Sequence, residues 1–280
     1  MPKPQEEHEI MLAAGPVRYR EAGTGEPIVF VHGYLANGGL WDGVVEALSG
    51  SFRCIVPDWP LGSQRVAMAP DADLSPLGIA AIIASFLEAL GLDEVTIAGN
   101  DSGGAMSQIL VANHPERVGR LVLTNCDSHE NFPPAIFKAL PFLGKLPGGI
   151  ALQVAPFRSS FLTRLIFKPL ARTPIPEKLL RSWVEPGLHD LDVRRDLKKV
   201  TVSMHKRYTL EAAEKLRGTE LPVLLAWAPG DRIFPLKYAE RLAAAMPNAR
   251  IVEIPDASTF VPLDQPKRLA EEIAAFVDAN

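Results

Sequence analysis

Long hydrophobic runs are missing from this 280-residue sequence. No stretch reaches the roughly 18 consecutive apolar residues that indicate a membrane-spanning helix, so we expect no integral association with a membrane. The opening residues, MPKPQEEHEIML, also lack the apolar core of a secretory signal peptide. Both absences favour a cytoplasmic location.

Cysteine is scarce as well, with two residues in the whole chain. Cys54 and Cys126 each lie in an apolar run, RCIVPDW and RLVLTNC, that has the character of a buried strand. Neither run supplies the histidine and acid that activate a nucleophilic thiol. We interpret both cysteines as small buried thiols of a protein that stays in a reducing compartment.

An excess of positive charge is absent, because 29 Lys and Arg residues stand against 33 Asp and Glu residues, for a net charge of −4. This balance argues against nucleic acid as a partner. We also predict no cofactor and no bound metal. The length is sufficient for one large α/β domain, or for a core domain that carries a smaller inserted one.

Short apolar runs alternate with amphipathic stretches of helix length along most of the chain. Such runs suit strands buried on both faces of a parallel sheet. They lie at 27–33, 53–59, 94–100, 120–126, 222–228 and 249–255. The stretch 76–91 repeats its apolar residues at three- and four-residue steps, as an amphipathic helix does. With an early antiparallel strand at PVRYREA, this alternation predicts the α/β class, a doubly wound and mostly parallel eight-stranded sheet.

The alternation stops between residues 127 and 219, where prolines interrupt short helical patterns. We therefore predict a core domain from residues 1–126 and 220–280, and a helical cap, or lid, from residues 127–219 that roofs a cavity. Residues 131–182 contain eight Lys and Arg residues against one acid, Glu177. This basic, apolar segment favours a small hydrophobic substrate with an acid group, or an anionic surface; solvated helix faces are the alternative.

The stretch TIAGNDSGGAMSQ (96–108) places a reactive side chain where a strand turns sharply into a helix. Such a turn needs small residues two positions before and two positions after the nucleophile. Around Asp101 these positions are Gly99 and Gly103, whereas around Ser102 they are Asn100 and Gly104. The spacing favours Asp101 as the nucleophile, at the N-terminus of a helix that would stabilise negative charge.

Four motifs together resemble the α/β-hydrolase fold family with a lid, over nearly the whole chain. They are FVHGY (30–34), GNDSGG (99–104), LLAWAPGDRIFP (224–235) and IPDASTFVPLDQP (254–266). The resemblance implies that the backbone amides of Tyr34 and Ser102 form an oxyanion hole and that Asp231 is the triad acid. An aspartate at the turn further resembles the haloalkane dehalogenase and epoxide hydrolase branch, in which the carboxylate forms an alkyl ester that a histidine-activated water cleaves.

The sequence departs from this family where its triad histidine belongs, because Thr259 occupies that position. A hydroxyl group has no useful basicity near neutral pH, so it does not replace imidazole as a base. His129 and His205 lie in or next to the predicted lid and are the candidates to replace the missing base, with an exposed or hydrogen-bonded lid histidine as the alternative for both. Trp41 and Trp59 are the indoles near the site, and we assign them to substrate binding, with the hydrophobic core as their alternative place.

Two functions follow from this pattern. The first is a hydrolase of a small hydrophobic ester, epoxide or haloalkane that uses Asp101 as nucleophile or base with an incomplete triad. Asp101 and Asp231 could also share one site, raise one pKa and transfer protons without a covalent step. The second is a binding protein or degenerate enzyme that keeps the cavity but lacks the base, including a chain in which the histidine was replaced.

Overall fold

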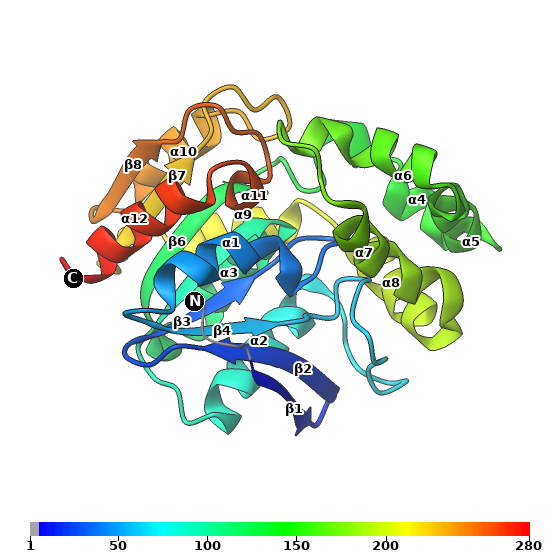
Figure 1. The fold of residues 1–280 in the computed structure, drawn as a ribbon, viewed down its shortest axis with the longest axis horizontal. Helices are drawn as coiled ribbons and strands as arrows, with labels where there is room; N and C mark the ends of the chain where they lie inside the picture. The colour runs from blue at the N-terminus through cyan, green and yellow to red at the C-terminus, as the bar shows by residue number, and fades with distance from the viewer. Residues whose placement is uncertain (1–5) are drawn as a thin grey trace.

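The computed structural model describes residues 6–280, which form an eight-stranded sheet with helices on both faces (Figure 1). The spatial order of the strands is β1-β2-β4-β3-β5-β6-β7-β8, and only the pairings of β1 with β2 and of β2 with β4 are antiparallel. The strands are β1 (Glu6–Leu12), β2 (Gly15–Ala22), β3 (Pro27–Val31), β4 (Arg53–Pro57), β5 (Val95–Asp101), β6 (Val118–Cys126), β7 (Val223–Trp227) and β8 (Ala249–Glu253). The predicted fold class is confirmed.

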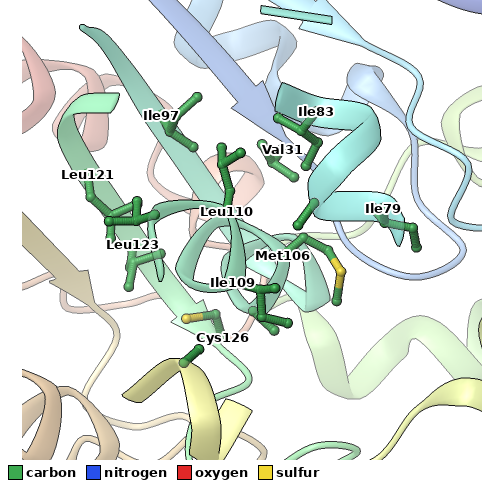
Figure 2. Close-up of a cluster of buried hydrophobic side chains, with 14 of the residues drawn as sticks. Val31, Ile79, Ile83, Ile97, Met106, Ile109, Leu110, Leu121, Leu123 and Cys126 are labelled. Atoms are coloured by element: carbon green, nitrogen blue, oxygen red, sulfur yellow. The ribbon is translucent and has the colours of Figure 1, made fainter. Parts of the chain in front are cut away.

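Continuous apolar runs form the central strands because both faces of the sheet are covered. Helices α2 (Pro76–Ala89), α3 (Ser102–Asn113), α9 (Arg207–Lys215) and α10 (Lys237–Ala245) contribute to the core on one face. Helices α1 (Asp42–Leu48), α11 (Val261–Asp264) and α12 (Pro266–Val277) contribute to the core on the other. Figure 2 shows Met106, Ile109 and Leu110 of α3 packed among side chains of the sheet and of α2.

The helix predicted at 76–91 is α2, and local signals set its bounds. The Ser75 hydroxyl accepts a hydrogen bond from the amide of Gly78, and Pro76 occupies the first turn. Gly91 has a φ of 63°, a left-handed conformation that suits glycine just beyond a helix. These residues therefore begin and end α2 close to the positions that the sequence pattern indicates.

The segment between β6 and β7, which we call the helical insert (residues 127–219), is built from short helices. They are α4 (Leu140–Lys145), α5 (Gly149–Val154), α6 (Ser160–Phe167), α7 (Glu177–His189), α8 (Leu191–Ser203) and α9. Helices α4 to α8 lie together beyond one end of the strands, at the right of Figure 1. Helix α9 instead packs against α3 of the core. The proposed domain boundary at 219 thus assigns α9 to the insert although its contacts are with the core.

Short 3-10 segments complete the helical structure. They are η1 (Gly38–Trp41), η2 (Pro115–Arg117), η3 (Ala135–Phe137), η4 (Ala155–Arg158) and η5 (Lys168–Leu170). In the insert, η3 precedes α4, whereas η4 and η5 follow α5 and α6, where Pro156 and Pro169 stop these two helices from continuing. Pro186, in contrast, lies inside α7. Within residues 6–280, no helix combines the length and apolar character needed to cross a membrane.

Candidate functional site

The sharp turn after β5 holds Asp101 in an unusual backbone conformation, with φ 55° and ψ −133°. A non-glycine residue there costs on the order of 1–3 kcal/mol unless its surroundings enforce it. The surroundings do so: a Cβ atom on Gly103 would collide with the carbonyl oxygens of Val31 and His32, and one on Gly99 would collide with Ser107. Glycine is therefore required at both positions that the sequence pattern singled out around Asp101.

The carboxyl group of Asp101 lies against the turn that follows β3. A Cβ atom on Gly33 would overlap the Asp101 carboxylate, so only glycine permits this approach. The amide of Ser102 hydrogen-bonds the same carboxylate. Tyr34 and Ser102, the residues expected to supply the oxyanion-hole amides, therefore lie beside Asp101.

Asp101 lies at the polar end of a cavity of about 200 Å³ beneath the helical insert. Tyr34, Ser102 and Asp127 line the same end. The remaining wall is almost entirely apolar and comes mainly from the insert, with Phe132, Phe137, Leu140, Val154, Phe157, Ile166, Phe167, Leu170 and Met204. This volume lies below the roughly 300–1,000 Å³ of sites for drug-sized ligands, so the cavity suits a small hydrophobic molecule.

Burial raises the pKa of Asp101 to about 7, and the negative charge of Asp231 adds to the rise. The Ser102 amide opposes it, because a donor to the carboxylate favours the ionised form. A carboxyl group with a pKa near neutrality changes charge within the physiological range. Asp101 is therefore suited to act as a nucleophile or a base and to exchange a proton with a neighbour.

Asp127 is the site residue that the sequence analysis missed. Its side chain is 1% exposed, it lines the cavity with Asp101, and neither of its carboxylate oxygens makes a hydrogen bond within residues 6–280. Burial raises its pKa well above the ordinary value, the charge of Asp101 adds to this, and the Ser102 hydroxyl opposes it. Burial and the charge of Asp101 outweigh the Ser102 hydroxyl, so this carboxyl group is held in its neutral form and can donate a proton.

The strand register explains why the two carboxyl groups meet. Strand β6 runs parallel to β5, Cys126 pairs with Asp101, and the Asp127 amide donates to the Asp101 carbonyl oxygen at 3.4 Å. The carboxyl ends of adjacent parallel strands face the same crevice. The position of Asp127 directly after a predicted central strand was therefore the sequence signal that could have revealed it.

Asp231 and Thr259 are in contact, as the triad positions require, but neither lines the cavity. The Thr259 hydroxyl donates to Asp231 Oδ2 at 2.9 Å, and Asp231 also accepts from Asn125 Nδ2 at 3.0 Å and from the Ile233 amide at 2.8 Å. Burial raises the pKa of Asp231, while these donors lower it. Its carboxylate is thus hydrogen-bonded behind the cavity and influences Asp101 through its charge.

The Tyr34 side chain joins the site to the insert. Its hydroxyl lies 2.7 Å from Thr201 Oγ1 of α8, and Thr201 in turn donates to the Leu197 carbonyl oxygen at 2.6 Å. Because Thr201 has one hydroxyl proton, Tyr34 is the donor to Thr201. Burial raises the pKa of Tyr34 to about 12, which keeps this phenol neutral. The bond holds α8 over the polar end of the cavity.

The assignment of Trp41 and Trp59 to substrate binding is not supported, because neither indole lines the cavity and both are fully buried. The Trp41 ring packs against Phe30 with a centroid distance of 4.9 Å. Trp59 Nε1 donates to the Phe30 carbonyl oxygen at 2.9 Å, and its ring packs edge-on against Phe86. Both residues therefore serve the hydrophobic core, the place given above as their alternative.

No histidine is among the residues that line the cavity within the described chain. His129 Nδ1 lies 3.3 Å from Ser128 Oγ, and burial lowers the pKa of its imidazole. His205 lies on a separate surface hollow beside Lys206 and Arg207. Neither histidine takes the place of the base. The residues from 6 to 280 also contain no group of three or more side chains arranged to hold a metal ion.

Known proteins share this architecture. Residues 26–266 match the family described as alpha/beta hydrolase fold. A haloalkane dehalogenase 2 of Mycobacterium tuberculosis is 28% identical over 264 residues, which cover 92% of this chain and 90% of that protein. A 2-hydroxy-6-oxononadienedioate/2-hydroxy-6-oxononatrienedioate hydrolase of Burkholderia vietnamiensis is 28% identical over 83% of this chain and 81% of its own length. The solved structure of an epoxide hydrolase, CorEH, superposes with a TM-score of 0.82 at 18% identity, covering 99% of both chains, which is a likeness of fold.

Proposed function

The chain belongs to the α/β hydrolase fold family, and we propose that it is a hydrolase of small hydrophobic molecules that favours epoxides over haloalkanes. One observation carries this proposal. Two carboxyl groups, those of Asp101 and Asp127, line one small apolar cavity, and only Asp101 has a backbone amide that stabilises its ionised form. The pair therefore supplies one nucleophilic carboxylate and one proton donor.

In the first step, the Asp101 carboxylate attacks an epoxide carbon. A carbon–oxygen bond forms between enzyme and substrate, the ring carbon–oxygen bond breaks, and the ring oxygen takes the proton of Asp127. Asp127 becomes a carboxylate as Asp101 becomes a neutral ester, so the total charge of the pair does not change. This conservation of charge matters in an apolar cavity, where a second negative charge is costly.

The proton of Asp127 distinguishes among the substrates considered. An epoxide oxygen or an ester alkoxide leaves as a strong base and needs a proton, whereas a halide leaves as a weak base and needs none. Halide release instead requires N–H donors, and Ser102 stands next to the nucleophile where the dehalogenase branch resembled above commonly has tryptophan. A neutral carboxyl group in the cavity thus favours epoxides and esters.

The second step hydrolyses the Asp101 ester. The Asp127 carboxylate takes a proton from water, the hydroxide adds to the ester carbonyl carbon, and collapse releases the product alkoxide, which regains a proton from the pair. The site returns to one carboxylate and one carboxylic acid, with water and epoxide consumed and a diol formed. Because a carboxylate is a weaker base than imidazole, we expect this step to be slow and the ester to accumulate.

Intact mass spectrometry tests the proposal directly. The full chain is incubated with matched small epoxides, haloalkanes and esters, and both the adduct mass and the released diol are followed over time. We expect an epoxide adduct that peptide mapping places on Asp101, and slow diol formation that Asp101→Ala abolishes. Asp278→Asn is the matched control, because it changes an exposed carboxyl group at the end of α12 that does not line the cavity. Diol formation that survives Asp101→Ala would refute the proposal.

A ligand-binding function is the second candidate, and the bonded state of Thr259 is the observation that favours it. The Thr259 hydroxyl is committed to Asp231, so the triad position offers no base to the cavity. In that case the cavity binds a small hydrophobic molecule without converting it. A ligand whose affinity is unchanged in Asp101→Ala, with neither adduct nor product in the wild-type chain, would select this function.

A further inference from the structure

The outer surface of the helical insert exposes an unusual number of hydrophobic side chains. Eight of the twelve large hydrophobic side chains that are exposed in the described chain lie between Ile136 and Ile166. We call these eight the apolar outer face: Ile136, Phe142, Leu146, Leu152, Phe161, Leu162, Leu165 and Ile166. They belong to η3, α4, α5, α6 and the loop after α4, and the three helices lie together at the margin of the molecule in Figure 1.

Several of these side chains are largely exposed. Phe142 is 66% exposed, Leu152 71% and Phe161 71%. Isolated exposed hydrophobic residues are ordinary on protein surfaces, but a concentration of them on one set of helices marks an interaction surface.

The segment that carries the apolar outer face contains charges of one sign. Residues 131–176 contain six Lys and Arg residues and no Asp or Glu, in a chain whose net charge is −4. All six cations are exposed: Lys138, Lys145, Arg158, Arg164, Lys168 and Arg172. Arg164 forms an ion pair with Glu177, whereas the other five make no ion pair within residues 6–280, and Arg172 Nε donates to the Ala257 carbonyl oxygen. The face therefore combines exposed hydrophobic side chains with unneutralised positive charge.

We propose that the apolar outer face docks on an anionic lipid surface, with its hydrophobic side chains in the lipid interface and its cations at the headgroups. This combination of chemistry is the one that amphipathic elements use to lie in the plane of a membrane. Basic side chains near an anionic bilayer are attracted to it, and their aliphatic stems allow them to reach the headgroups. No spanning helix is required.

A second copy of the chain is a poorer occupant for the same face. A twofold interface is self-complementary, so the face of one copy would contact the same face of the other. That contact would place the cations of both copies together, with no acid in residues 131–176 to neutralise them. Like charges in an apolar interface are costly. The charge distribution therefore selects an anionic surface rather than self-association.

The face is also the outer side of the cavity wall. Ile166 is exposed and lines the cavity, while Phe137 and Leu140 line the cavity from η3 and α4, the elements that carry Ile136 and Phe142. A hydrophobic molecule dissolved in a membrane would thus lie next to the helices that enclose Asp101. Docking places the cavity close to where apolar substrates concentrate.

Co-sedimentation with vesicles tests the docking surface. The full chain is mixed with vesicles of phosphatidylcholine alone or of phosphatidylcholine with phosphatidylserine, at low and high salt. We expect binding to the anionic vesicles that weakens with salt, and little binding to the neutral ones. Because the measurement needs no turnover, it is made with Asp101→Ala as well, and its outcome is independent of the proposed hydrolase activity.

Two sets of variants locate the binding. Phe142→Ser, Phe161→Ser and Leu165→Ser combined should reduce partitioning at least tenfold, whereas Met11→Ser and Leu191→Ser, which are also exposed, should not. Lys138→Gln, Lys145→Gln and Lys168→Gln should each reduce partitioning onto the anionic vesicles roughly fivefold. Lys198→Gln, Lys237→Gln and Lys267→Gln, which are exposed elsewhere, are the control set.

Three results would overturn the proposal. They are the absence of binding to either vesicle, equal binding to neutral and anionic vesicles, and a dimer in solution that dissociates when Phe142 and Phe161 are replaced. Size-exclusion chromatography with light scattering over a range of concentrations measures the last. Circular dichroism of each variant verifies that the fold is retained, as expected for side chains that make few contacts.

Discussion

The carboxyl groups of Asp101 and Asp127 line one cavity from the ends of two neighbouring parallel strands, and burial affects their pKa values to different extents. The pKa of Asp101 is raised to about 7 and that of Asp127 well above its ordinary value, although Ser102 opposes both rises, through its amide at Asp101 and its hydroxyl at Asp127. Two negative charges so close together in an apolar cavity would repel strongly. The pair therefore holds a proton, and Asp127 is the member better placed to keep it.

Asp127→Asn tests that division of roles. An amide preserves the shape of the side chain but donates no acidic proton, so adduct formation with an epoxide should slow by on the order of 10²–10⁴-fold. Adduct formation with a haloalkane of matched size should change much less, because a halide leaves without a proton. The ratio of the two rates, measured by intact mass on one preparation, is the readout. Equal slowing for both substrates would contradict the assignment of Asp127 as the acid.

The pKa of Asp101 also predicts how stability depends on pH. The folded protein keeps this proton up to about pH 7, whereas an unfolded chain loses it near 3.8. Between these values the folded state binds more protons, so the free energy of unfolding falls as the pH rises and levels off above about pH 7. This contribution is absent from Asp101→Asn. We expect the variant to match the wild type near pH 4 and to be more stable at pH 8 by on the order of 2–4 kcal/mol.

Chemical denaturation at pH 4, 6 and 8 measures this difference, with Asp278→Asn as the exposed control. Asp127 titrates with Asp101 as a pair, so both groups contribute to the pH dependence of the wild type. A variant that is less stable than the wild type at pH 8 would mean that the ionised Asp101 carboxylate is well solvated or paired. That result would also remove the basis for its raised pKa.

The fold was predictable because its signals are local. Continuous apolar runs identify strands covered on both faces. Gly99 and Gly103 are recognised by their spacing around Asp101, although the atoms that require glycine at 103 are the carbonyl oxygens of Val31 and His32, far away in the sequence. Trp41 and Trp59 could not be placed in this way, because the packing of whole helices decides whether an indole faces a cavity or the core. Asp127 escaped notice for a related reason. The pairing of β5 with β6 brings Asp127 beside Asp101, and the helical insert encloses both carboxyl groups in one cavity. Neither relationship can be read from the residues that flank Asp127 in the sequence.

Thr259 occupies the triad histidine position, so substitutions there test whether the surrounding residues still support a catalytic base. Its hydroxyl bonds Asp231, its carbonyl oxygen accepts from Asn100 Nδ2 at 2.7 Å, and its side chain is fully buried. Thr259→Val keeps the shape but leaves Asp231 short of one donor, which should cost about 1–3 kcal/mol in unfolding free energy. This variant should leave the rate of adduct formation unchanged, because Thr259 does not line the cavity.

Thr259→His places an imidazole beside an acid that is already oriented by Asn125 and the Ile233 amide. If the imidazole reaches the Asp101 ester, it supplies the base that the second step lacks, and ester hydrolysis should accelerate by on the order of 10²–10⁴-fold. The decay of the preformed adduct, followed by intact mass after excess epoxide is removed, isolates this step from the first. A folded Thr259→His variant whose adduct decays no faster than that of the wild type would mean that the wall around Asp231 has closed over the position from which a histidine could act.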